Sequence, residues 1–238
     1  EVASAAVYVR FKGADQNLNQ TGFITVSSGT SDAQSVALYG ETLDYTPSTI
    51  ADVTTNDVDG VVDSLDVYVS LEGVVHCIDF DGNEGLSFSI IDLDNNGINV
   101  YNFADVSAYV VNEGDMIRIL GQIGQFNGLT QVFADSILVI ATDMPTVTPT
   151  VVTALNEDTE SQWITLEGVN FVDPIATFPA GTNNIDVTDG TNIYTLRIDS
   201  DTDIPGSGTP QGQFSVTGVG GQYDSSNPFD DGYQLFPC

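Results

Sequence analysis

The stretch that decides the fold is residues 113–133, EGDMIRILGQIGQFNGLTQVF, in which apolar and polar residues alternate on both sides of glycine-marked bends. This pattern predicts a β-strand, a bend and a second β-strand. A looser copy, QFSVTGVGGQYDSSNPFDDGYQLF, occupies residues 213–236. Glycine, glutamine and aromatic positions repeat between the two copies, whereas charged positions do not. The repeat therefore predicts a duplicated fold and does not indicate a duplicated binding or catalytic site. The matched positions are Gly121 with Gly218, Gly124-Gln125-Phe126 with Gly221-Gln222-Tyr223, and Gln131-Val132-Phe133 with Gln234-Leu235-Phe236.

The residues before the first copy predict three more strands, at 65–80, 85–92 and 98–103, followed by a short crossover at 104–111. Three strands, a crossover and two strands are the layout of an OB-fold, a five-stranded Greek-key barrel. The second half repeats the layout, with an Asp189-Gly190 hairpin turn. We therefore predict an all-β chain with an OB-like barrel at 65–142, a linker at 143–150 and a second OB-like barrel at 151–238.

The N-terminal residues 1–42 predict three further strands, at 4–11, 22–28 and 34–41. Three strands with one apolar face cannot bury that face by themselves. Either the opening strands of a sandwich lie outside this sequence, or another chain supplies them by β-strand addition. Residues 43–64 are polar, acidic and punctuated by proline and glycine, so they predict a linker.

The charge composition limits the kinds of partner. The chain of 238 residues carries 34 acidic and 4 basic residues, for a net charge of −30. Such charge attracts cations and repels polyanions. An acidic surface with almost no lysine is typical of a secreted protein in a salty setting, so we expect an extracellular or cell-surface location. No apolar run has membrane-spanning length, so we expect no membrane insertion.

The two cysteines, Cys77 and Cys238, leave three alternatives open. Cys77 can be a buried thiol, the two can form a disulfide in an oxidising compartment, or Cys238 can bridge to another molecule. No CxxC spacing indicates zinc.

Two resemblances add to this interpretation. The pattern VYVRF, GFITVSSG and SVALYGE in residues 7–41 resembles the closing half of immunoglobulin-like β-sandwich repeats. The stretches ADVTTNDVDGVVDSLDVYVSLEGVV, GLSFSIIDLDNNGINVYNF and the two copies above resemble tandem OB-like modules of secreted Bacteroidetes proteins, over about residues 48–237. Such proteins are often exported by the type IX system, and similar modules accompany extracellular nucleases and lamin-tail domains. The resemblance implies an extracellular module and no particular activity.

Asp92, Asp94 and Asn96, followed by Gly97, match the first half of a calcium-binding loop. The bidentate glutamate expected at position twelve is replaced by Phe103, and a hairpin turn accounts for the same residues. We favour the turn and retain calcium as the one cofactor the sequence suggests. Asp57-x-Asp59-Gly60 and Asp230-Asp231-Gly232 are weaker calcium candidates.

No catalytic group is indicated. His76 is the only histidine, and its neighbour Cys77 points to the opposite face of a strand, so a Cys-His pair is disfavoured. No GxSxG motif occurs. With 34 acidic residues, chance carboxylate pairs are frequent. We therefore expect no enzymatic activity.

Aromatic residues on the predicted barrels are the candidate ligand contacts, chiefly Phe126, Tyr223 and Tyr233. Nucleic-acid binding by OB-folds also needs a basic groove, and Arg118 and Arg197 are isolated, so nucleic acid is disfavoured as a partner. Trp163 is expected to cap the second core.

The sequence thus predicts a non-enzymatic structural or adhesive protein, completed through residues 4–41 by a neighbouring chain or by self-association into a filament. The alternative is an accessory module of a secreted enzyme that binds carbohydrate, calcium or nucleic acid.

Overall fold

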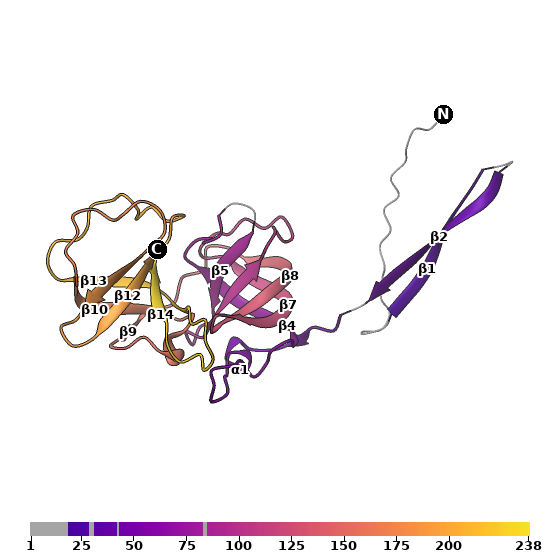
Figure 1. The fold of residues 1–238 in the computed structure, drawn as a ribbon. Helices are drawn as coiled ribbons and strands as arrows, with labels where there is room; N and C mark the ends of the chain where they lie inside the picture. The colour runs from indigo at the N-terminus through magenta and orange to yellow at the C-terminus, as the bar shows by residue number, and fades with distance from the viewer. Residues whose placement is uncertain (1–18, 29–30, 42, 83–84) are drawn as a thin grey trace. The chain divides into compact units, whose positions relative to one another are not determined.

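The structure, a computed structural model, describes residues 19–28, 31–41, 43–82 and 85–238. The chain divides into two units, residues 1–45 and 46–238, each of which is described by itself. The expected strand at 4–11 lies outside the described residues. The fold is all-β, as predicted, and its two short helical segments are described below (Figure 1).

The first unit contains an antiparallel ribbon of two strands, β1 (Asn19–Ser28) and β2 (Ser31–Glu41). Its register pairs Ile24 with Val36, and both side chains therefore lie on one face of the ribbon. Val36 is 61% exposed and Phe23, on the opposite face, is 75% exposed. Two large apolar side chains of this ribbon, Phe23 and Val36, are therefore mostly exposed.

The first barrel of the second unit is closed by pairing in the order β4-β5-β6-β8-β7-β4. All neighbours are antiparallel except β6 and β8, which run parallel. Its interior is filled by buried aliphatic residues and by Phe88, which is fully buried. The strands are β4 (Tyr68–His76), β5 (Leu86–Ile91), β6 (Gly97–Asn102), β7 (Met116–Phe126) and β8 (Leu129–Ala141).

The sequence predicts a linker over residues 43–64, but the structure differs. From Thr46 onward, this segment packs as part of the first barrel. β3 (Thr46–Pro47) pairs in parallel with β4, and α1 (Ile50–Val53) begins at a Thr49 capping box. The Ile50 side chain packs against Gly73 of β4: a Cβ atom added to Gly73 would lie only 3.3 Å from Ile50 Cδ1. Helix α1 therefore covers one end of the barrel next to β4 (Figure 1). Three apolar residues of this otherwise polar segment are buried in the barrel core and plug its end: Ile50, Val53 and Val62.

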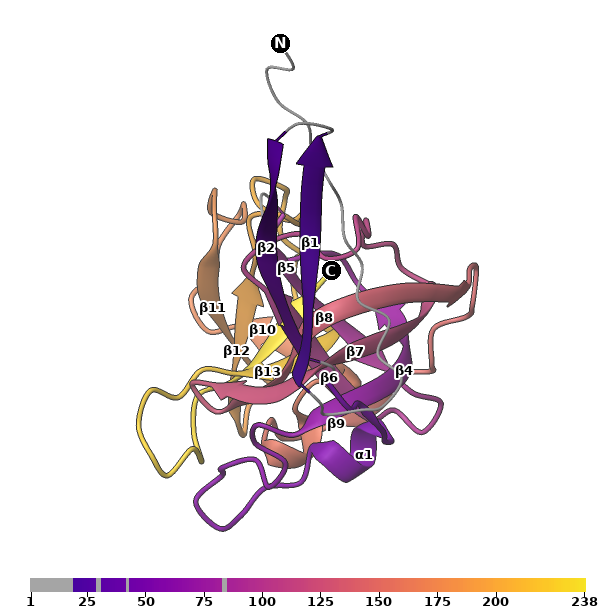
Figure 2. The same ribbon diagram turned by 90° about the vertical axis from the view of Figure 1, so that its right-hand side faces the viewer.

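The second barrel repeats the connections of the first. Its order is β11-β12-β14-β13-β10, closed by a short β10–β11 pairing, and β12 and β14 are its parallel neighbours. Figure 2 shows β11 and β12 of this barrel side by side. The elements are β9 (Thr150–Val152), η1 (Glu157–Thr159), β10 (Trp163–Phe171), β11 (Asn183–Thr188), β12 (Ile193–Ile198), β13 (Phe214–Gln222) and β14 (Tyr233–Pro237).

The structure explains why the repeated positions agree. A side chain at Gly124 would collide with the ring of Phe133, and one at Gly221 would collide with the ring of Phe236. The two glutamines bind nearby loop carbonyls: Gln125 Nε2 donates to Gly60 at 2.7 Å, and Gln222 Nε2 to Asp231 at 3.0 Å. Each copy of the repeat is thus a pair of antiparallel strands, in which a glycine on the first strand leaves space for an aromatic ring on the second.

Candidate functional site: the joint between the barrels

The two barrels of residues 46–238 meet in a polar contact region, which we call the joint. At one edge, the Asn95 side chain pairs with the backbone at the start of β10, accepting from Trp163 N at 2.9 Å and donating to Trp163 O at 3.0 Å. A Cβ at Gly97 would collide with the carbonyl of Ser161. The tip of the predicted calcium loop therefore serves as a docking element.

The remaining residues of that loop bind one another. Asp92 Oδ1 accepts hydrogen bonds from the backbone of Asp94 and Asn96, each at 2.9 Å, and its Oδ2 accepts from Asn96 Nδ2 at 2.9 Å. These contacts form an Asx-type turn. Among the described residues, no group of three or more His, Cys, Asp or Glu side chains is arranged to hold a metal ion.

Cys77 and Cys238 are bonded to each other across the joint, with their Cα atoms 5.7 Å apart. Neither the free-thiol nor the intermolecular alternative applies to this structure. The bond ties the residue after β4 of the first barrel to the residue after β14 of the second. It also consumes the thiol that a Cys-His catalytic pair would need.

His76 is fully buried and connects three parts of the joint. Its Nδ1 lies 2.9 Å from the Val74 carbonyl, and its Nε2 accepts from Val147 N, in the segment between the barrels, at 3.2 Å. The ring meets Trp163 edge-on, with centroids 5.6 Å apart. Trp163 thus packs on the other barrel, which corrects the expectation that it caps the second core. Burial lowers the His76 pKa, which keeps the ring neutral and structural.

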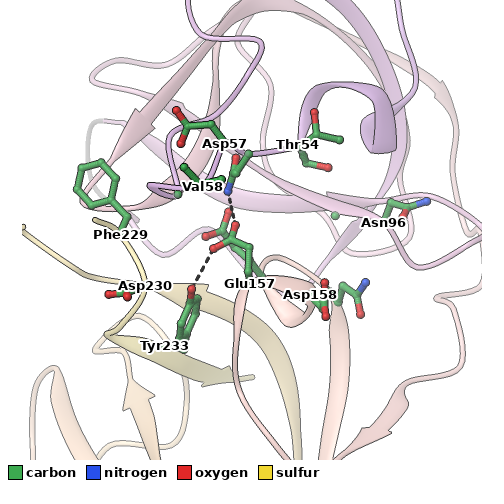
Figure 3. A pocket seen from close by; sticks show the side chains of 15 residues that line it. Thr54, Asp57, Val58, Asn96, Glu157, Asp158, Phe229, Asp230 and Tyr233 are labelled. Atoms are coloured by element: carbon green, nitrogen blue, oxygen red, sulfur yellow. Dashed lines mark hydrogen bonds between the residues drawn. The ribbon is translucent and has the colours of Figure 1, made fainter. Parts of the chain in front are cut away.

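A cleft of about 650 Å³ opens at the joint between loop 54–60 of the first barrel and the η1 and 229–233 segments of the second (Figure 3). Glu157 occupies its middle and is held from both sides. Its Oε1 accepts from the Asn56 side-chain amide of the first barrel, and its Oε2 accepts from the Tyr233 hydroxyl at 3.0 Å. Burial is the main cause that raises the Glu157 pKa.

Glu160 is the second carboxyl of the cleft. Its Oε1 accepts from the backbone amide of Thr130, in the first barrel, at 2.9 Å. Burial raises its pKa to about 8. The four buried side-chain atoms without a hydrogen-bond partner among the described residues all belong to residues at the joint: Asn56 Oδ1, Thr130 Oγ1, Glu160 Oε2 and Gln222 Oε1.

The three predicted aromatic residues lie at or beside the joint. Phe126 and Tyr223, matched positions of the two repeats, form an edge-on pair with centroids 6.3 Å apart. They are 57% and 58% exposed, respectively. Tyr233 lines the cleft instead and binds Glu157. Of the weaker calcium candidates, Asp57 and Asp230 also line the cleft.

Sequence reasoning missed Asn56, Glu157 and Glu160. Their residue types carry no signal in a chain with 34 acidic residues, and Asn56 lies 101 positions from the carboxylate that it binds. Arg118 and Glu72 form an exposed cross-strand salt bridge, and neither residue lines the cleft.

No helix of the described residues is long and apolar enough to cross a membrane. No protein-family model matches the sequence, and no curated protein matches it significantly.

Proposed function

We propose that this chain is a non-enzymatic structural or adhesive part of an extracellular protein, in which two OB-fold barrels act as one rigid spacer. The joint carries this proposal, because the residues best suited to chemistry hold the barrels together. Cys77 is in a disulfide, and both nitrogens of His76 have backbone partners. The disulfide also supports an oxidising, extracellular location.

The OB-fold assignment is supported by the strand order. Each barrel pairs its first strand with its second and fourth, and its third strand in parallel with its fifth. We further propose kinship with the tandem OB-like modules of secreted Bacteroidetes proteins, which the duplicated glycine, glutamine and phenylalanine positions support.

We propose that residues 4–41 complete an immunoglobulin-like sandwich with strands from a neighbouring chain, giving a filament or surface fibre. The support is the β1–β2 ribbon, because an isolated two-stranded hairpin is marginally stable in water. Exposed Val36, beside Ile24 on one face, offers the apolar surface that added strands would cover.

Electron microscopy and sedimentation of the purified chain test this assembly. We expect concentration-dependent polymers that Val36→Lys abolishes, since a charge would be buried at the contact. Thr25→Lys, on the opposite face of the same ribbon, is the matched control and should polymerise normally. Monodisperse monomers whose residues 19–41 resist hydrogen exchange would contradict the proposal.

A second candidate function, an accessory ligand-binding module, is favoured by the exposed Phe126–Tyr223 pair. Aromatic rings can stack on sugars or bases, and the net charge of −30 favours sugars over nucleic acid. A screen of glycans and single-stranded oligonucleotides at varied calcium tests it. Binding that survives Phe126→Ala and Tyr223→Ala together would exclude this surface.

A further inference from the structure

The second barrel carries a groove of about 340 Å³ on its outer face, along the parallel seam of β12 and β14. Loop residues 154–155 and 231–232 complete its walls, and Tyr233 is the one lining residue that it shares with the joint cleft. Among the described residues that line the groove, the only charged side chain is Asp231. The lining is otherwise rich in side-chain amides and hydroxyls, chiefly those of Asn184, Asn192, Thr195 and Gln234.

Gln234 is the unusual group of this groove. Its neighbour Leu235 belongs to the barrel core, so the Gln234 side chain points to the outer face. The residue is only 9% exposed, yet its side-chain amide has no hydrogen-bond partner among the described residues. Water satisfies this amide while the groove is open, but a ligand that displaces the water must itself offer hydrogen bonds.

The first barrel shows what the same position does when it is closed. Gln131, the counterpart of Gln234, donates from Nε2 to Asn99 Oδ1 at 2.9 Å, and both residues are buried. The cavity beside Asn99 is lined partly by residues of the second barrel, which therefore covers this face. In the second barrel Thr195 takes the place of Asn99, and its hydroxyl donates to Asp186 instead. The glutamine that the fold satisfies in one barrel is thus left free in the other.

We propose that this groove binds a neutral saccharide. A side-chain amide donates and accepts hydrogen bonds at once, which matches the paired hydroxyl groups on neighbouring carbons of a sugar ring. Gln234 supplies such an amide, and Asn184 and Asn192 add two more. Ile193, which is 66% exposed, offers apolar surface to the C–H face of the ring. The volume lies in the range of small-molecule sites.

Other classes of ligand fit the groove less well. Phosphate and carboxylate ligands need cationic partners, and no Lys, Arg or His is among its described lining residues. A purely apolar ligand would bury the Gln234 amide without a partner. A peptide that adds as a strand needs a free sheet edge, whereas β12 and β14 are paired with each other along the groove.

This inference rests on the second candidate function, the accessory binding module, and names a different surface for the ligand. Two-dimensional NMR of the whole 15N-labelled chain tests it with neutral tetrasaccharides at up to about 10 mM, in the weak-binding range. The probes are cellotetraose, xylotetraose, mannotetraose, maltotetraose and laminaritetraose. At least one should shift the side-chain amide resonance of Gln234 and the backbone amide of Ile193, and the titration gives its dissociation constant.

Gln234→Leu should weaken this binding about tenfold or more, because both amide hydrogen bonds to the sugar are lost. Ile193→Ala, at an exposed position that cannot disturb the core, should weaken it about threefold. The matched control is Gln213→Leu, the same substitution at an exposed position of the same barrel outside the groove. It should leave the dissociation constant within about twofold. Equal weakening by Gln213→Leu would overturn the proposal.

Stability measurements test the free amide separately. Gln131→Leu should lower the urea midpoint, since Asn99 loses its partner, whereas Gln234→Leu should leave the midpoint unchanged. An equal loss in both variants would show that the fold itself uses the Gln234 amide, and would overturn the proposal.

The Phe126→Ala and Tyr223→Ala double variant separates the two surfaces, because neither residue lines the groove. It should retain binding within about twofold. Binding that is lost in this double variant and kept in Gln234→Leu would overturn the groove site and leave the accessory-module function standing. Binding of none of the tetrasaccharides by folded protein would overturn the groove site together with a saccharide-binding role for the module.

Discussion

At the scale of single residues, Glu160 makes the joint sensitive to pH. Burial raises its pKa from 4.5 to about 8. The unfolded chain loses this proton above pH 4.5 and the folded chain only near pH 8, so folding weakens as pH rises through that window. The buried carboxyl therefore destabilises the folded protein once it is ionised at alkaline pH. Its hydrogen bond to Thr130 N needs only an acceptor oxygen, which glutamine also provides.

We predict that Glu160→Gln raises the free energy of unfolding relative to wild type. The gain should grow from pH 5 to pH 8, reaching on the order of 1–3 kcal/mol, and then level off. Urea denaturation of both proteins at several pH values measures it. Glu167→Gln, on the exposed side of β10, is the control and should show no such growth. A gain independent of pH would mean that Glu160 is charged in the folded protein at pH 5.

At the scale of elements, the paired strands β7 with β8 and β13 with β14 depend on glycines beneath aromatic rings. We predict that Gly124→Ala destabilises the protein by about 1–3 kcal/mol, because the added Cβ collides with the ring of Phe133. Gly208→Ala, whose Cβ would meet nothing within 4 Å, should change stability by less than about 0.5 kcal/mol. Thermal unfolding of both variants measures the difference, and equal effects would refute the packing explanation.

Alternating residues made most barrel strands predictable at this scale, because side chains of a strand alternate between core and solvent. The linker prediction for 43–64 failed for a physical reason. Ile50, Val53 and Val62 are too few and too widely spaced to give a periodic signal, yet each finds a place in the barrel core. A short plug of this kind is defined by the cavity that it fills, which only the folded barrel provides.

At the scale of the whole molecule, the joint could not be predicted from sequence. Asn95 and Trp163 lie 68 positions apart, and Asn-Gly turns look the same whether they face water or a second barrel. The repeated glycines indicated two similar barrels but not which surfaces meet. For the same reason, sequence identified Phe126 and Tyr223 as separate candidates, whereas the structure brings them into contact.

The disulfide gives the third prediction. Cys77 and Cys238 are separated by 161 positions, and closing so long a loop restricts the unfolded chain. Cys77→Ser with Cys238→Ser should lower the free energy of unfolding by roughly 3–5 kcal/mol. Denaturation with and without reductant measures it, and reductant should not affect the double variant. An unchanged wild-type midpoint after complete reduction would contradict the prediction.

The same bond redirects mechanical load. Tension applied between the segment before β4 and Cys238 passes from Cys77 straight through the sulfur bridge, so residues 78–237 form a covalent loop outside the load path. The second barrel then carries almost no pulling force, and the first bears it through β4 alone. If the bond is reduced, residues 78–237 join the load path, and their complete unfolding would then add roughly 500 Å of extended chain.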